Sequence, residues 1–211
     1  MKRTLLTLAA VAGLTAFSNA QEFGFGKGNT IVEGNLGFVT ENDKTIELKE
    51  SSFLFTPKVG YFFTDKFAAG LSLRVLNTTE DKYNSTIDKQ TKGNGIGGGI
   101  FGRYYFLELG SRFKTYAEVA VDYTSTKKEE TVKGTTTESP KTNTFGIGGG
   151  VGANYFLTDK IAINFALSNV IGYNSSKVDI SGAKATSEFG LNVNQFRNFF
   201  DAASFGLTFK F

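Results

Sequence analysis

The chain has 211 residues, a formal net charge of +3, 25 glycines, 22 phenylalanines and 8 tyrosines, and it contains no Cys, His or Trp. The absence of Cys and His excludes a disulfide framework, a thiolate nucleophile, an imidazole metal site and a Ser/His/Asp triad, and with them most hydrolase chemistry. Aromatic residues make up 14% of the chain, which together with the glycine content favours strands over helices.

The N-terminal segment has the organisation of a secretory signal peptide. Met1–Arg3 is a short basic region, and an apolar run extends over Leu5–Phe17. Ser18 and Ala20 are the small residues expected before a cleavage site between Ala20 and Gln21. The apolar run is too short to cross a hydrocarbon core of roughly 30 Å as a helix, so a membrane anchor is the weaker interpretation.

We therefore expect residues 1–20 to be a signal peptide and residues 21–211 to form the mature chain. Removal of Lys2 and Arg3 reduces the basic residues from 23 to 21, against 20 acidic residues. Such a nearly neutral mature chain gives no indication of nucleic-acid binding.

Apolar residues after the signal peptide recur with period two, as in a strand with one apolar face. In Ser204–Phe211, a terminal stripe of Phe205, Leu207, Phe209 and Phe211 alternates with small or polar residues. Seven further segments of this kind begin near Val32, Phe53, Ala69, Gly95, Ala117, Phe145 and Ile161. The sequence predicts an all-β protein, an eight-stranded antiparallel up-and-down transmembrane β-barrel with strands of about nine to thirteen residues.

The connections between these segments alternate in length. Short turns are predicted at Phe63–Lys66, Leu107–Arg112 and Leu157–Lys160. Long polar segments separate them: Thr40–Ser51, Asn77–Asn94, Thr126–Asn143 and Asn174–Glu188. This alternation indicates short periplasmic turns and long extracellular loops, and aromatic residues at both ends of the strands match the interfacial belts of a membrane barrel.

The same parity places a set of charged side chains on the inward face: Glu33, Lys58, Arg74, Arg103, Lys114, Glu118, Asp122 and Lys210. An eight-stranded barrel is only wide enough for side chains, so we expect these charges to pair and form a closed polar network in the lumen. The alternative is a narrow solute path along the inner wall of Gly146–Gly152, where small residues leave space.

The sequence of Gly97–Gly102 matches the spacing of glycines in a dinucleotide-binding motif, but this segment continues a strand and does not begin a helix. No catalytic, cofactor or metal site is predicted.

Four segments carry a family resemblance when taken in order: Gly28–Thr30, Pro57–Phe62, Arg103–Phe106 and Ser204–Phe211. They resemble the small outer-membrane β-barrel family common in Bacteroidetes, which is distantly similar to OmpA/OmpX-type barrels. The resemblance covers essentially the whole mature chain, so we expect residues 21–211 to form one outer-membrane β-barrel domain. It implies a location in the cell outer membrane among its lipids, and it implies that the terminal stripe is the signal read by the barrel-assembly machinery during insertion.

Three functional classes remain open from the sequence. The favoured one is a non-enzymatic envelope barrel whose extracellular loops serve envelope structure or surface interaction. The second is a porin-like channel for small solutes or hydrophobic compounds. A soluble periplasmic ligand-binding barrel or an outer-membrane enzyme is the third, and the aromatic belts and the missing His argue against it. The sequence identifies no solute and no extracellular partner.

Overall fold

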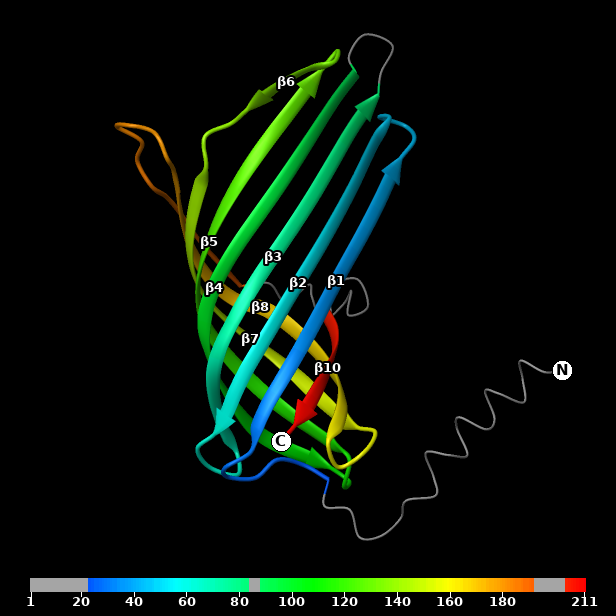
Figure 1. The fold of residues 1–211 in the computed structure, drawn as a ribbon, viewed down its shortest axis with the longest axis vertical. Helices are drawn as coiled ribbons and strands as arrows, with labels where there is room; N and C mark the ends of the chain where they lie inside the picture. The colour runs from blue at the N-terminus through cyan, green and yellow to red at the C-terminus, as the bar shows by residue number, and fades with distance from the viewer. Residues whose placement is uncertain (1–22, 84–87, 192–203) are drawn as a thin grey trace, which may run out of the picture.

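The computed structural model describes residues 23–83, 88–191 and 204–211, and these residues form one antiparallel sheet of ten strands (Figure 1). Among them no helix is long and apolar enough to cross a membrane. The predicted signal peptide and its cleavage site between Ala20 and Gln21 lie outside the described residues.

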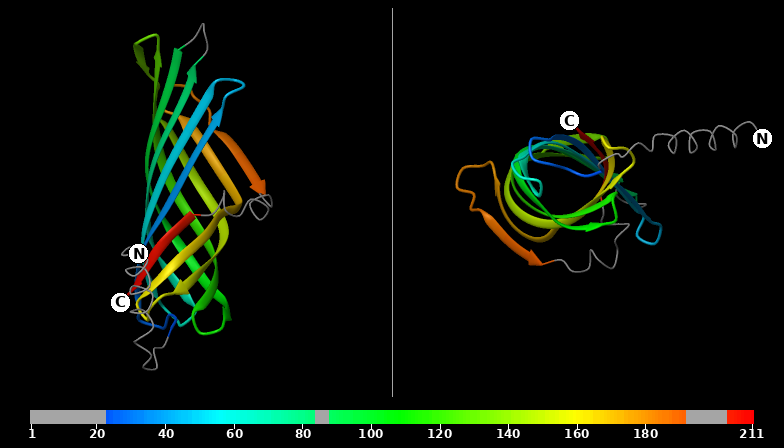
Figure 2. Two further views of the ribbon diagram at one scale, coloured as in Figure 1. Left: turned by 90° about the vertical axis from the view of Figure 1, so that its right-hand side faces the viewer. Right: turned by 90° about the horizontal axis from the view of Figure 1, so that it is seen from below.

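The ten strands follow one another along the chain as β1 (Thr30–Asp43), β2 (Leu48–Phe62), β3 (Phe67–Tyr83), β4 (Asp88–Leu109), β5 (Phe113–Val132), β6 (Thr135–Glu138), β7 (Thr142–Phe156), β8 (Ile161–Val178), β9 (Thr186–Leu191) and β10 (Ser204–Lys210). The pairing order is β10-β1-β2-β3-β4-β5-β7-β8, and β10 also pairs with β8. The path of paired strands therefore returns to its start, and the strands enclose a ring when seen along the barrel axis (Figure 2).

The all-β antiparallel architecture agrees with the predicted fold class. The described residues contain ten strands, whereas the sequence predicts eight, because β6 and β9 lie in segments that the sequence predicts as loops. β6 pairs with β5, and β9 pairs with the far part of β8.

The strands are longer than predicted. β4 has 22 residues and β5 has 20, and the β1–β2 ladder continues through Thr40 and Ser51 to Asp43 and Leu48. Hydrophobic periodicity misses these extensions because both of their faces are polar, whereas the backbone ladder needs no apolar side chain. The extensions project beyond β7, β8 and β10 at one end, which we name the long-strand end; the turns at 63–66, 110–112 and 157–160 mark the short-turn end (Figure 1).

The outer and inner faces of the wall follow the predicted parity. Leu71, Ile100 and Val119 point outward and are 66%, 58% and 58% exposed. Inward neighbours such as Ala68 and Phe101 are buried. Since large apolar side chains cover most of the outside, this wall is suited to a hydrocarbon environment.

Glycines on the inner face allow β5, β7 and β8 to approach one another closely. A Cβ added at Gly150 would lie 2.2 Å from the carbonyl oxygen of Leu167, and one added at Gly152 would lie 2.3 Å from Cζ of Tyr116. The β7–β8 register also shifts between Gly149 and Val151. Glycine is thus required here by space, as expected where a small barrel coils tightly.

Candidate functional site

Four of the predicted inward charges meet in the interior and form what we call the charge layer: Glu33, Lys58, Arg103 and Glu118. They come from β1, β2, β4 and β5, so residues far apart in sequence converge across the barrel. The side chains of Glu33 and Arg103 are fully buried. Two cations and two carboxylates give the layer no net charge, which is the arrangement that limits the cost of burial.

Arg103 is the centre of the charge layer. Its Nη1 and Nη2 donate to the two oxygens of Glu33 at 2.8 and 3.0 Å. Nε and Nη2 donate to Oε2 of Glu118 at 2.9 and 2.6 Å. The guanidinium carbon also lies 3.9 Å from the ring centroid of Tyr116. Planar, bidentate pairing of this kind fixes the side chain in one orientation.

The second carboxylate links the arginine to a lysine. Oε1 of Glu118 accepts a hydrogen bond from Nζ of Lys58. The Lys58 ammonium also lies 5.2 Å from the ring centroid of Phe101. Every charge of the layer therefore has an opposite charge in contact, and none depends on bulk water for its partner.

Neutral polar side chains complete the hydrogen bonding around the charge layer: Asn35, Tyr105, Tyr116, Asn154, Asn164 and Thr208. Nδ2 of Asn35 and Oγ1 of Thr208 donate to Glu33 at 2.7 and 2.9 Å. The Tyr105 hydroxyl donates to Oδ1 of Asn154 at 2.8 Å. Such a connected network adds rigidity because each group holds its neighbour in place.

Aromatic rings close the interior between the charge layer and the short-turn end. Phe25 stacks on Phe62 with ring centroids 4.7 Å apart, and it also contacts Tyr105 and Phe156, each at 4.9 Å. We call these four residues the aromatic cluster. Phe25 precedes β1, so the segment before the first strand contributes a ring to the interior of the barrel.

Further contacts hold this segment at the short-turn end. Nζ of Lys210 donates to the carbonyl oxygen of Gly24 at 2.8 Å, and the amide of Lys27 donates to Oδ1 of Asp65 at 2.8 Å. Lys114 pairs with Glu108 at 2.6 Å. The short-turn end is thus closed by side chains and by residues 24–28 of the chain itself.

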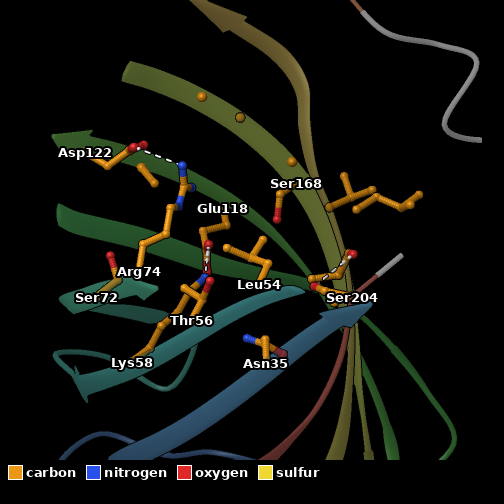
Figure 3. Close-up of a pocket in the computed structure, with 18 of the residues that line it drawn as sticks. Asn35, Leu54, Thr56, Lys58, Ser72, Arg74, Glu118, Asp122, Ser168 and Ser204 are labelled. Atoms are coloured by element: carbon orange, nitrogen blue, oxygen red, sulfur yellow. Dashed lines mark hydrogen bonds and ion pairs between the residues drawn. The ribbon is translucent and has the colours of Figure 1, made fainter. Parts of the chain in front are cut away.

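A cavity of about 360 Å³ lies on the other side of the charge layer, toward the long-strand end (Figure 3). Lys58 and Glu118 line it, as do the hydroxyl-bearing Thr56, Ser72 and Ser168. Three consecutive glycines, at 148–150, also line it and leave space in the wall.

Arg74 and Asp122 form a separate ion pair in this cavity, where Nη1 and Oδ1 are 3.2 Å apart (Figure 3). Their side chains are 33% and 20% exposed, unlike the fully buried Arg103. This pair is a single contact beside open space, so it is weaker than the bidentate Arg103–Glu33 pair.

The structure therefore groups the predicted inward charges in three sets. Glu33, Lys58, Arg103 and Glu118 form the charge layer, and Arg74 pairs with Asp122. The remaining two, Lys114 and Lys210, lie toward the short-turn end with Glu108 and Gly24. Sequence reasoning missed Glu108 because this residue falls in the predicted turn Leu107–Arg112, whereas β4 continues to Leu109. A register shift between Tyr105 and Leu107 then places Glu108 opposite Lys114.

Within the described residues, no group of three His, Cys, Asp or Glu side chains is placed to hold a metal ion. Glu118 and Asp122 do not share a hydrogen-bond partner, because Glu118 bonds Arg103 and Lys58 whereas Asp122 bonds Arg74. The terminal stripe lies on the outer face of β10, where Phe205, Leu207 and Phe209 are 37–44% exposed.

The sequence matches the family described as "Outer membrane protein beta-barrel domain" over residues 4–211. The chain belongs to this family. Its location is accordingly the outer membrane. A comparison with curated protein sequences found no significant match.

Solved structures of outer-membrane proteins are similar to this chain. The outer membrane protein OprG from Pseudomonas aeruginosa has 17% sequence identity and a TM-score of 0.52, covering 89% of this chain and 98% of that chain. The N-terminal β-barrel domain of OprF from the same organism has 13% identity and a TM-score of 0.44, covering 88% and 99%. At such identities the likeness to OprG shows a common fold and carries no information on ligands.

Proposed function

We propose that this protein is a non-enzymatic outer-membrane barrel with a closed interior. In this proposal β1–β5, β7, β8 and β10 are the eight membrane-spanning strands. The short turns lie in the periplasm, and the long-strand end projects from the cell and presents its hairpins for envelope structure or surface interaction. Residues 1–20 direct export and are removed between Ala20 and Gln21.

The observation that carries this proposal is the charge layer. Arg103 and Glu33 are fully buried and paired, so no continuous water path passes between them. The aromatic cluster forms a second barrier on the periplasmic side of the layer. An ion that crossed the barrel would have to separate the ion pairs of the charge layer and displace the rings of the aromatic cluster. Separating the buried charges alone costs several kcal/mol.

Conductance tests the closed interior. Wild-type protein in planar bilayers should show no steady conductance. The variant Glu118→Ala leaves Arg103 and Lys58 with one carboxylate fewer, and removal of one partner of a buried pair typically costs about 3 to 5 kcal/mol. Stable conductance steps from the wild type, together with an unchanged melting temperature of Glu118→Ala, would refute the closed barrel.

A small-solute channel is the second candidate, and the cavity of about 360 Å³ is the observation that favours it. A channel requires the charge layer to open so that the cavity becomes continuous with the periplasm. Solute uptake by proteoliposomes distinguishes the two functions, because a closed barrel leaves uptake at the level of empty vesicles.

We also propose that the terminal stripe is read by the barrel-assembly machinery. Deletion of Phe211 should then reduce outer-membrane insertion far more than Lys128→Ala, a substitution in the long-strand end. Equal amounts of both variants in the outer membrane would contradict this proposal and would mean that the stripe serves only packing.

A further inference from the structure

The outer face near the long-strand end is layered in three tiers. On β5, Tyr123, Ser125 and Lys127 point outward at successive alternate positions. The aromatic residue ends the apolar part of the wall, the hydroxyl follows, and the lysine lies four residues from the ring. At about 3.3 Å per residue this separation is about 13 Å along the strand.

The same order of apolar, Ser or Asn, and Lys occurs in four other places around the wall. The residues are Phe53, Ser51 and Lys49 on β2; Ile96, Asn94 and Lys92 on β4; Phe145, Asn143 and Lys141 on and directly before β7; and Tyr173, Ser175 and Lys177 on β8. We call the five lysines the lysine tier. On β1 and β3 the corresponding positions are Asn42 and Thr79, so the tier is incomplete there.

The tiers are continuous across neighbouring strands. Tyr123 is paired with Phe145, and Ser125 with Asn143, in the β5–β7 register. Asn143 is paired with Lys177 in the β7–β8 register. The ladder extends to Lys141, whose carbonyl accepts the amide of Asp179 at 2.8 Å. Lys127, Lys141 and Lys177 therefore lie on three adjacent strands of one surface.

Acidic residues occupy the next tier outward. Asp81, Glu129 and Asp179 each lie six residues beyond the outward apolar residue of their strand. Three lysines of the tier have acidic partners in this region: Lys127 pairs with Glu138 at 2.7 Å, Lys49 is opposite Asp81 in the β2–β3 register, and Lys92 is opposite Glu129 in the β4–β5 register. Along β5, and along β8 and the residue that follows it, positive charge (Lys127, Lys177) is therefore nearest to the apolar wall and negative charge (Glu129, Asp179) is farther from it.

This order matches the layers of a lipid leaflet. With strands tilted by about 40°, 13 Å along a strand corresponds to about 10 Å along the membrane normal. Headgroups extend roughly 5 to 8 Å beyond the hydrocarbon, and a lysine stem can bend toward them by several Å. The ammonium groups of the lysine tier thus reach the depth of the headgroup phosphates, while the acidic tier stays in water.

We propose that the lysine tier binds the phosphate groups of outer-leaflet lipids. The Ser and Asn tier bonds the polar backbone of the same headgroups, and the aromatic tier contacts the start of their acyl chains. The inference rests on the orientation given under the proposed function, with the long-strand end outside. It assigns to β5, β7 and β8 a lipid-recognition surface where three lysines adjoin.

Lipid retention by the purified barrel tests this surface. The variant Lys127→Gln/Lys141→Gln/Lys177→Gln is compared with a matched control, Lys44→Gln/Lys82→Gln/Lys133→Gln, which removes the same charge from exposed positions outside the tier. Both are incubated in detergent with lipid A, or with lipid A from which the phosphates have been removed. Bound lipid is counted by native mass spectrometry.

Wild type and control should retain lipid A equally, and the tier variant should bind it at least about tenfold more weakly, since each cation near an anionic lipid surface contributes measurably. The dephosphorylated lipid should bind all three proteins alike. Equal retention of lipid A by the tier variant and the control overturns the proposal. If the triple variant does not show the gel shift of a folded barrel, the single variant Lys177→Gln, with an expected loss of about threefold to fivefold, replaces it. Failure of the closed interior would be seen separately, as conductance of the wild type.

Discussion

Two arginines on adjacent strands, Arg103 on β4 and Arg74 on β3, have the same chemistry and very different surroundings. Arg103 bonds two carboxylates, lies against an aromatic ring and is fully buried. Arg74 makes one contact of 3.2 Å to Asp122, and its side chain is 33% exposed. An ion pair on the inner face therefore does not by itself contribute much to stability. The free energy lost when one partner is removed depends on how deeply the pair is buried.

The two halves of the interior differ in the same way. Toward the short-turn end, rings of the aromatic cluster fill the space between the strands. Toward the long-strand end, glycines at 148–150 leave the cavity open. The short-turn end is therefore filled by side chains, which we call the floor of the barrel, whereas the long-strand end contains an open cavity.

The largest expected effect comes from Arg103→Met. It leaves Glu33 and Glu118 buried with one cation fewer, and we expect a loss of about 3 to 5 kcal/mol in the free energy of unfolding. Arg74→Met, at a single part-buried contact beside the cavity, should lose no more than about 1 kcal/mol. Urea titrations of the folded barrel in lipid vesicles measure both free energies of unfolding. Similar losses for the two variants would contradict the predicted difference between the two arginines.

Close packing of the inner wall gives the next effect. In Gly150→Ala the new Cβ would meet the Leu167 carbonyl at 2.2 Å, so the β7–β8 ladder must shift, and overpacking of this kind costs about 1 to 3 kcal/mol. Gly190→Ala on β9 is the control, since a Cβ there meets nothing within 4 Å. The same urea titration applies, and a neutral Gly150→Ala would mean that the wall is not tightly packed.

A smaller loss is expected for Phe25→Ala. The ring is only partly buried, so removal of its contacts with Phe62 and Phe156 should cost about 1 to 2 kcal/mol, below the range for a fully buried phenylalanine. Phe189→Ala, at a side chain that is 70% exposed, serves as the control. If the melting temperatures of the two variants agree, the segment before β1 does not contribute to the floor.

The sequence predicts the faces of the strands well, because parity depends only on the alternation of side chains along a strand. It does not predict which inward charges meet. Glu33 and Glu118 both reach Arg103 from strands that are not neighbours of each other, and this depends on the stagger of the whole ring. Phe25 was missed for another reason: it lies before the first strand, where no periodic pattern marks a ring as interior.

The strand that closes the ring also completes the hydrogen bonding of the buried Glu33 carboxylate. Among the residues that the structure describes, β10 joins β1 through six paired positions, whereas β1 and β2 share fourteen. Across that seam Thr208 reaches Glu33, which is 175 residues away in sequence. Contacts between such distant residues form slowly, since the hairpins between them fold first. Glu33 acquires the hydrogen bond from Thr208 only when β10 pairs with β1, whereas its charge is matched by Arg103 on β4. A ring that is open at this seam therefore leaves a fully buried carboxylate short of one hydrogen-bond donor, which makes it less stable than the closed ring.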